Sequence, residues 1–311
     1  MRATSTENIL SPETGAETGT ADAPTVDAAS QVAEQLAALQ AELVNLRKEV
    51  NFRNRRDETL NFQMFRLDEE LRLAARLQQD FLPKTLPQVG PIHFHTLYRP
   101  AGYVSGDIYD VARLDEAHVG FYIADAVGHG MPAALLTMFI KNALVTKEIL
   151  PGGYRLLDPG EALSRLNVAL VEQNLSHATF ATALYGTINV NTLMCCFAGA
   201  GHPPPLIVRA DGSILNLHGE GALLGIFPEE RYGYSQVQLH SGDRLFVYTD
   251  GIEVAFSGDQ ASNAQQWRDE IQRRCHLPTD EILKDLSESL DRETGSLTPM
   301  DDITIIVAEL K

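Results

Sequence analysis

Four short acidic motifs in the C-terminal two-thirds of the chain constrain its fold more than any other feature. In each, an aspartate stands next to an apolar run and beside glycine or another turn-forming residue. The motifs are VSGDIYD (104–110), YIADAVGHG (122–130), VYTDGIEVA (247–255) and MDDITIIV (300–307). Such a position is typical of the end of a β-strand. A rigid sheet can therefore bring Asp107, Asp125, Asp250 and Asp301 together at one point.

Carboxylates gathered in one cleft repel one another unless a cation lies between them. The motifs offer oxygen donors, including the backbone carbonyl of Ala126, and no cysteine or closely spaced histidine. Hard cations prefer oxygen ligands, so the pattern favours Mg²⁺ or Mn²⁺ over zinc or copper. Two such ions can hold a water between them and orient a phosphate for in-line attack. The motifs therefore indicate phosphoester hydrolysis without a covalent enzyme intermediate.

The composition restricts the partners and the location of the protein. The 311 residues, 44% of them hydrophobic, can form one large domain or two smaller ones. A net charge of −17 argues against a nucleic-acid partner, because nothing in bulk neutralises phosphates. The first residues lack the apolar core of a signal peptide, and no window is long enough to span a bilayer. We expect a cytoplasmic protein that does not contact a membrane.

The N-terminal part of the chain changes character near residue 28. Residues 1–27 have no hydrophobic periodicity, and we expect them to be disordered. Apolar residues then alternate at spacings of four and three, as in a heptad repeat: Val32, Leu36, Leu39, Leu43, Leu46, Val50, and after the polar residues 51–57, Leu60, Met64, Leu67 and Leu71. The pattern predicts a helical segment over residues 28–82, about 75 Å long if unbroken.

An isolated helix of this kind cannot bury its apolar seam. A parallel homodimer through residues 32–82 buries it against a second copy. The alternative is a chain that folds back on itself at the polar residues 51–57. The unbroken register favours the dimer. The segment is either a passive dimerisation handle or a switch that repositions the metal-binding elements, and the sequence leaves both readings open.

After Pro83 and Pro87 the order of elements is that of an α+β domain, which we expect to occupy residues 83–311. Strand-like runs fill residues 93–127, and helical runs follow at 131–150 and 159–174. Four or five strands are expected between 179 and 250. Two helical patches, 264–275 and 279–291, then precede a last strand at 302–310. There is no GxGxxG motif and no P-loop.

Five motifs in this order resemble those of the metal-dependent PPM serine/threonine phosphatases, in particular the bacterial SpoIIE/RsbU branch of partner-switching pathways. The motifs are SGDxYD, ADxxGHGxPAA, AGHPPPL, a YTDGIxE-like motif that reads YTDGIEV here, and DDITxxV. The resemblance covers roughly residues 76–311. It includes ARLQQDFLP (75–83), which is similar to the short helix before the catalytic domain of that branch. It implies an αββα sandwich with a dinuclear Mn²⁺ or Mg²⁺ centre between the sheets.

The resemblance also implies roles for single residues. Asp125 would bridge both ions, Asp107 and the Ala126 carbonyl would complete the ligands of one, and Asp250 and Asp301 would bind the other. Asp302 would orient water or cap a turn. The implied substrate is a phosphoserine or phosphothreonine on a STAS-domain protein, which then captures an anti-sigma factor.

Other residues near the motifs have two readings each. His129 could shuttle a proton, although a histidine between glycines is more often structural. Arg99 could reach a phosphate, although a surface arginine is the more common case. His202, which precedes three prolines, is expected to fix a turn. Two alternatives to a phosphatase are a catalytically silent dimeric scaffold that binds a phosphoprotein and a metal-dependent nucleotidyl cyclase. The intact set of aspartates argues against the first, and the lack of placeable phosphate-gripping basic residues argues against the second.

Overall fold

The computed structural model describes residues 26–175, 179–219, 221–257, 264–293 and 301–311. The chain forms two compact units, residues 1–66 and 67–311. Helix α1 (Val26–Phe81) supplies the described residues of the first unit and begins the second. Residues 1–25 of the segment expected to be disordered, 1–27, lie outside the described residues. None of the described helices has the length and hydropathy needed to cross a bilayer.

The predicted helical segment is one continuous helix. Residues 51–57 are helical like their neighbours. Arg53 and Glu49, one helical turn apart, form an ion pair at 2.7 Å. The structure therefore contradicts the fold-back alternative. The polar residues there are compatible with a helix, and they include neither proline nor glycine to break it.

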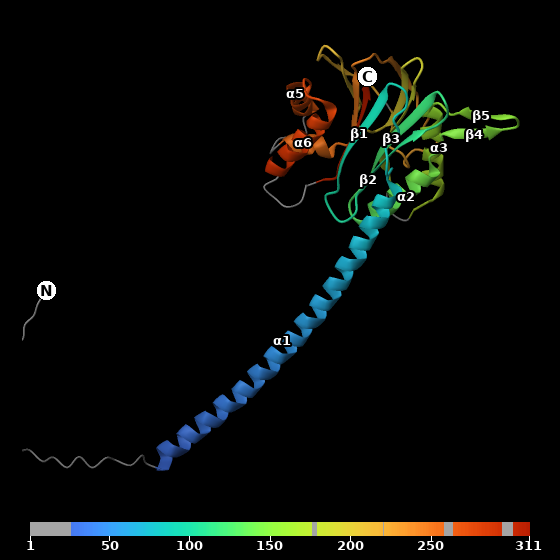
Figure 1. Cartoon of the computed structure of the whole chain (residues 1–311). Coiled ribbons are helices and arrows are strands. Elements are labelled where there is room, and N and C mark those ends of the chain that lie inside the picture. The colour runs from blue at the N-terminus through green and yellow to red at the C-terminus, as the bar shows by residue number, and fades with distance from the viewer. Residues whose placement is uncertain (1–25, 176–178, 220, 258–263, 294–300) are drawn as a thin grey trace, which may run out of the picture. The chain divides into compact units, whose positions relative to one another are not determined.

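The second unit contains two five-stranded antiparallel sheets (Figure 1). One has the order β1 (Ile92–Arg99), β12 (Ile303–Leu310), β11 (Arg244–Tyr248), β8 (Leu206–Val208) and β9 (Ile214–Asn216). The other has the order β10 (Ser235–Gln238), β7 (Met194–Ala200), β6 (Ala181–Asn189), β3 (His118–Ala126) and β2 (Asp107–Arg113). The predicted strand runs form strands, but the described residues between 179 and 250 form six strands instead of four or five, because residues 205–217 make the two paired strands β8 and β9.

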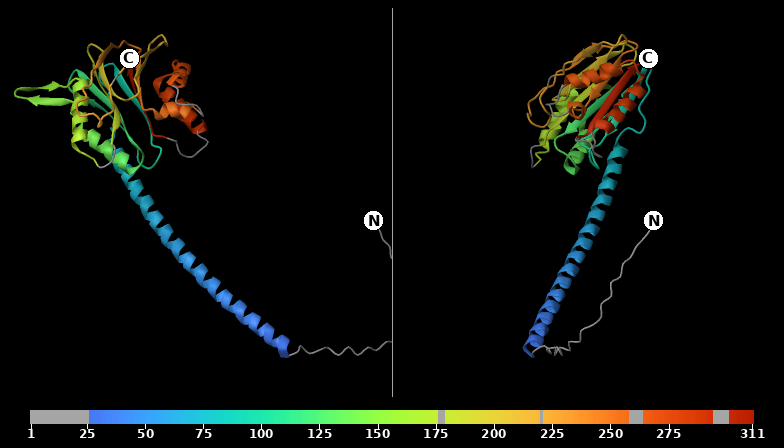
Figure 2. Two further views of the ribbon diagram at one scale, coloured as in Figure 1. Left: turned by 180° about the vertical axis from the view of Figure 1, so that it is seen from behind. Right: turned by 90° about the vertical axis from the view of Figure 1, so that its left-hand side faces the viewer.

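Helices cover both outer faces. Figure 2 shows α5 (Ala264–Arg274) and α6 (Thr279–Glu293) beside the sheet that contains β12, and α2 (Met131–Ala143) and α3 (Pro159–Glu172) beside the other. Strand β12 is buried on both sides. Ile306 belongs to the core between the sheets, whereas Ile305 and Val307 pack with Trp267 under α5 and α6. This arrangement explains the uninterrupted apolar run ITIIV, and it confirms the αββα sandwich.

The helix predicted over 131–150 is too long. Helix α2 ends at Ala143, and β4 (Lys147–Leu150) pairs with β5 (Gly153–Leu156) in a hairpin that projects from the domain (Figure 1). Gly152 has φ +87° in the connecting turn, a conformation that glycine adopts without strain. The turn residues Pro151, Gly152 and Gly153 outweigh the helical spacing of the apolar residues before them.

Candidate metal centre and active site

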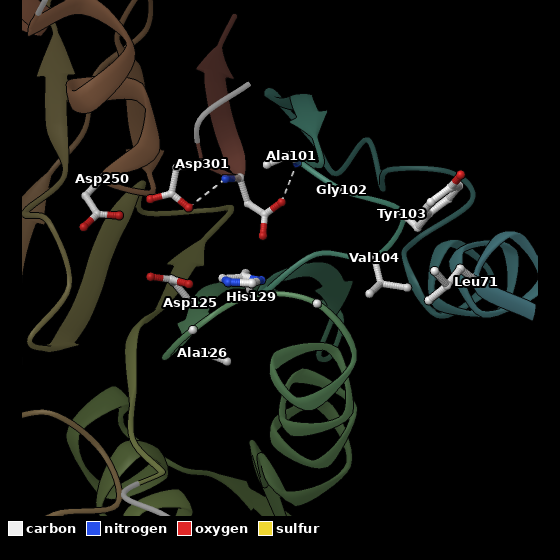
Figure 3. A pocket seen from close by; sticks show the side chains of 13 residues that line it. Leu71, Ala101, Gly102, Tyr103, Val104, Asp125, Ala126, His129, Asp250 and Asp301 are labelled. Atoms are coloured by element: carbon white, nitrogen blue, oxygen red, sulfur yellow. Dashed lines mark hydrogen bonds between the residues drawn. The ribbon is translucent and has the colours of Figure 1, made fainter. Parts of the chain in front are cut away.

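Three strand ends place carboxylates around one pocket of about 630 Å³ (Figure 3). Asp125 is the penultimate residue of β3, Asp250 follows β11, and Asp301 precedes β12. Strands β11 and β12 are antiparallel neighbours, with Tyr248 opposite Ile305. The end of one strand therefore lies beside the start of the other, and this edge faces the end of β3 across the sandwich.

Asp107 lies behind the pocket rather than in its wall. The register of β2 and β3 sets Asp107 directly opposite Asp125. The Asp107 side chain is buried, and its Oδ2 accepts hydrogen bonds from Thr249 Oγ1 (2.9 Å) and Thr304 Oγ1 (2.6 Å) of the opposite sheet. Burial, and then repulsion by Asp125, raise the pKa of Asp107 well above its usual range. Asp107 thus links the two sheets through its Oδ2.

The pocket concentrates negative charge. Burial raises the pKa of Asp125 to about 8, with further contributions from Asp250, Asp301 and Asp302. The pKa of Asp301 is also raised, chiefly by burial. Neither lysine nor arginine is among the described residues that line the pocket. A cation would stabilise the charged carboxylates, which burial and, after it, mutual repulsion disfavour.

The carboxylates converge without forming a finished ligand cage. Among the described residues, no three acidic, histidine or cysteine side chains lie close enough together to hold an ion as they stand. Asp250 and Asp301 are exposed, and Asp301 Oδ1 accepts a hydrogen bond from the Asp302 amide at 2.8 Å. The pocket is therefore a converging set of oxygen donors.

The backbone of Ala126 lies against Gly106. The Ala126 amide donates to the Gly106 carbonyl (2.9 Å), and a Cβ on Gly106 would stand 3.1 Å from the Ala126 oxygen. A side chain at residue 106 would thus crowd the carbonyl that the sequence predicts to be a ligand. Ala126 itself lines the pocket.

Asp302 caps the loop over residues 101–106, one of the two roles that the sequence predicts for it. Its Oδ1 accepts from the Ala101 amide and its Oδ2 from the Gly106 amide, both at 2.6 Å. One buried carboxylate thereby fixes both ends of the loop that leads into Asp107. These partners are about 200 residues away in the sequence, so local patterns contain no signal of the contact.

Gly251 begins a short helix, α4 (Gly251–Ser257), where the sequence predicts only a glycine turn. A Cβ at residue 251 would lie 2.0 Å from the Asp302 carbonyl oxygen, so only glycine fits. This close approach brings the start of α4, and Asp250 immediately before it, against the start of β12.

Of the three other candidate residues, only His129 lines the pocket among the described residues. His129 lines the pocket, on the loop between β3 and α2, between Gly128 (φ +88°) and Gly130 (φ +74°) (Figure 3). Arg99 donates instead to the Ser287 carbonyl (2.8 Å) and pairs with Asp291 (2.6 Å) on α6. His202 is buried and hydrogen-bonded to Thr182 Oγ1 at 2.8 Å, which agrees with a structural role.

Comparisons with known proteins identify the family of the chain. The family model described as "Stage II sporulation protein E (SpoIIE)" matches residues 115–311. The chain is 28% identical over 246 residues to "Phosphoserine phosphatase RsbU" of Bacillus subtilis, covering 79% of this chain and 71% of that protein. It spans less than half of the length of two further relatives, 41% and 47%.

Solved structures have the same fold. The SiaA-PP2C domain of Pseudomonas aeruginosa superposes with a TM-score of 0.67 at 23% identity, covering 80% of this chain and 98% of that one. RsbX, solved in complex with magnesium, gives a TM-score of 0.52 at 18% identity, covering 73% of this chain and 99% of that one. At these identities the likeness concerns the fold alone.

Proposed function

The chain belongs to the SpoIIE family of PPM-type serine/threonine phosphatases, and we propose that it hydrolyses a phosphoserine or phosphothreonine on a regulatory protein by means of two Mn²⁺ or Mg²⁺ ions. The observation that carries the proposal is the convergence of Asp125, Asp250 and Asp301 from three strand ends on one pocket.

The residues of the pocket fit divalent ions. Asp125 is the most strongly affected of the pocket carboxylates, with its pKa raised to about 8, and no hydrogen bond from the described residues compensates its charge. The donors are carboxylates and a backbone carbonyl, the ligands preferred by Mg²⁺ and Mn²⁺. Asp125 would contact both ions, Asp107 and the Ala126 carbonyl one of them, and Asp250 with Asp301 the other. Bound ions would supply an activated water and positive charge for the phosphate.

The chain's own residues position these ligands. Thr249 and Thr304 hold Asp107 Oδ2, so Oδ1 would be the oxygen that binds a cation. Asp302 holds the loop over residues 101–106 through two backbone amides. We assign Asp302 a positioning role for this reason, since both of its oxygens already accept hydrogen bonds.

His129 is the candidate proton donor to the leaving hydroxyl of serine or threonine. It is exposed, it lines the pocket, and lysine and arginine are missing from the described lining. A serine or threonine alkoxide is a poor leaving group and needs a proton, and histidine supplies protons near neutral pH.

The proposed substrate is a phosphorylated STAS-domain protein of a partner-switching pathway. Support comes from membership in the SpoIIE family and from the similarity to RsbU, a phosphoserine phosphatase. Dephosphorylation would let the STAS-domain protein bind its anti-sigma factor.

We further propose that the protein is a homodimer through the part of residues 32–82 that precedes Leu71, because Leu71 itself lines the pocket. The apolar residues of the heptad seam are exposed on the continuous helix α1; they include Val32 (64%), Leu36 (56%), Leu39 (58%), Leu43 (53%) and Leu46 (50%). Exposed leucines at this spacing are typical of a helix that pairs with a second helix.

One assay tests the phosphatase activity. Turnover of p-nitrophenyl phosphate with Mn²⁺ is measured for the wild type, for Asp125→Asn and for Glu116→Gln, which changes a carboxylate in the turn between β2 and β3. We expect metal-dependent turnover that Asp125→Asn lowers roughly 100-fold or more and Glu116→Gln preserves. A wild type without metal-dependent turnover would instead support the catalytically silent scaffold.

A further inference from the structure

The pocket has two chemically different ends. Aspartates occupy one end, whereas Leu71, Tyr103 and Val104 occupy the other (Figure 3). We call these three residues the apolar shelf. Phosphate hydrolysis uses only the acidic end. A pocket of about 630 Å³ is of the size that binds a whole ligand segment, so the shelf enlarges the site beyond the phosphate itself.

Contacts with helix α1 hold Tyr103 of the shelf in place. The Tyr103 hydroxyl donates to Asp68 of α1, which also pairs with Arg72 at 2.7 Å. The Arg72 guanidinium carbon lies 6.0 Å from the centre of the Tyr103 ring. Tyr103 nevertheless remains 44% exposed, and Val104 is buried beside it. An aromatic surface that is fixed in advance and still exposed binds a partner at a low ordering cost.

The shelf is also tied to the acidic end. Tyr103 and Val104 belong to the loop over residues 101–106, whose two ends are bonded to Asp302. The neighbouring residue, Ser105, is bonded through its backbone to the Gln78 side chain. The distance between the shelf and the carboxylates is therefore set by the fold and does not depend on a mobile loop.

We propose that the apolar shelf binds an apolar side chain close in sequence to the phosphorylated serine or threonine of the substrate. The inference rests on the proposed phosphatase function and adds a sequence preference to it. The shelf offers carbon surface, and the pocket lining has no lysine or arginine among the described residues. An acidic residue next to the phosphoserine finds no cationic partner on the shelf, whereas an apolar one buries its surface.

The test compares two short synthetic phosphoserine peptides, one with leucine on both sides of the phosphoserine and one with serine there. The readout is the ratio of kcat/KM for the two peptides, determined with Mn²⁺ on the full chain. A ratio within one variant cancels differences in folding and in metal content. We expect the wild type to prefer the leucine peptide by roughly 10-fold or more, as apolar pockets discriminate side chains.

Leu71→Ser is the test variant and Leu73→Ser its control. Leu73 lies two residues further along α1, is 51% exposed and is not part of the pocket lining. We expect Leu71→Ser to bring the ratio close to one and Leu73→Ser to retain the wild-type ratio. Equal kcat/KM for both peptides in the wild type, or a preference that survives Leu71→Ser, would overturn the proposal.

The proposed function can fail separately from the shelf. Turnover of p-nitrophenyl phosphate without a peptide preference refutes only the shelf. If the protein turns over no phosphate ester, the phosphatase proposal fails, and the same ratio is then measured as Kd by fluorescence polarisation. Equal Kd values for the two peptides would still refute the shelf, and a leucine preference lost in Leu71→Ser would still support it.

Discussion

The side chain of Gln78 forms two hydrogen bonds with the backbone of Ser105. Its Nε2 donates to the Ser105 carbonyl at 2.7 Å, and its Oε1 accepts from the Ser105 amide at 2.9 Å. The Ser105 hydroxyl in turn accepts from the Asp107 amide at 3.0 Å. The last turns of α1 are thus connected through one buried glutamine to the strand that carries Asp107.

Gln78→Ala should weaken both stability and turnover. It leaves a buried N–H and a buried C=O of Ser105 without partners, at a cost of about 1–3 kcal/mol in the free energy of unfolding. Turnover should fall because Asp107 loses the support of Ser105. Urea denaturation and metal-dependent hydrolysis of p-nitrophenyl phosphate measure the two effects. Gln79→Ala, at the exposed neighbouring residue, should change neither. An unaltered unfolding midpoint in Gln78→Ala would contradict the role of these bonds.

Asp302→Asn should destabilise the protein although it removes one charge from the acidic cluster. Asparagine has a single acceptor oxygen, so it cannot accept from both the Ala101 and Gly106 amides. We expect a loss of about 1–3 kcal/mol in the free energy of unfolding. Asp250→Asn is the matched comparison, because it removes a charge from the same pocket at an exposed side chain. Should the two variants unfold at the same urea concentration, Asp302 would be no more than another charge in the cluster.

The strands and the acidic edge of the sandwich could be predicted from local patterns. Asp125, Asp250 and Asp301 each adjoin an apolar run that forms a strand, and the pocket gathers these three residues. The placement of Asp107 behind them follows from its pairing with Asp125 across two strands. That pairing depends on strand register, which one sequence does not specify.

The errors have local and long-range causes. The sequence predicts a helix in place of the β4–β5 hairpin because Val145 and Ile149 continue the helical spacing of α2. Residues 151–153, Pro-Gly-Gly, are nevertheless typical of a turn. The helix start at Gly251, and the partners that Asp302 caps, depend on contacts between segments far apart in the chain. Such contacts follow from the assembled sandwich and leave no pattern in either segment alone.

The metal-free protein should lose stability as the pH rises from about 4 to about 8. The pKa of Asp125 is about 8 in the folded state, above the value of roughly 3.9 for an unfolded chain. Between these values the folded state binds a proton that the unfolded state has released, so the free energy of unfolding falls with rising pH. The pKa of Asp107 is shifted in the same direction.

Thermal unfolding in EDTA at pH 6 and pH 8.5 measures this effect. We expect the wild type to melt several degrees lower at pH 8.5, and Mn²⁺ to restore stability mainly at the higher pH. Asp125→Asn cannot ionise, so its melting temperature in EDTA should depend less on pH. A wild-type melting temperature that rises between pH 6 and pH 8.5 in EDTA would show that burial and neighbouring charges do not raise the pKa of Asp125 in the folded state.

His129→Gln should slow the hydrolysis of a phosphoserine peptide much more than that of p-nitrophenyl phosphate. The nitrophenolate leaves without a proton, whereas the serine alkoxide needs one. General acid catalysis contributes roughly 100-fold or more to such steps. Steady-state kcat values with both substrates at saturating Mn²⁺ measure the difference. An equal loss with both substrates would assign His129 a structural role in the loop between Gly128 and Gly130.

Leu43→Glu should convert the proposed dimer into a monomer. Leu43 lies in the middle of the heptad seam and is 53% exposed on α1. Each chain would lose about 1.5–3 kcal/mol of apolar burial. Each would also bring one glutamate carboxylate into the seam, and the two carboxylates would repel each other. Ala41→Glu introduces the same side chain two residues earlier, outside the seam, and should remain dimeric. Light scattering on the full chain gives the mass of each variant. A wild type with the mass of a single chain would refute the dimer, and an unchanged dimer in Leu43→Glu would show that the seam is not its interface.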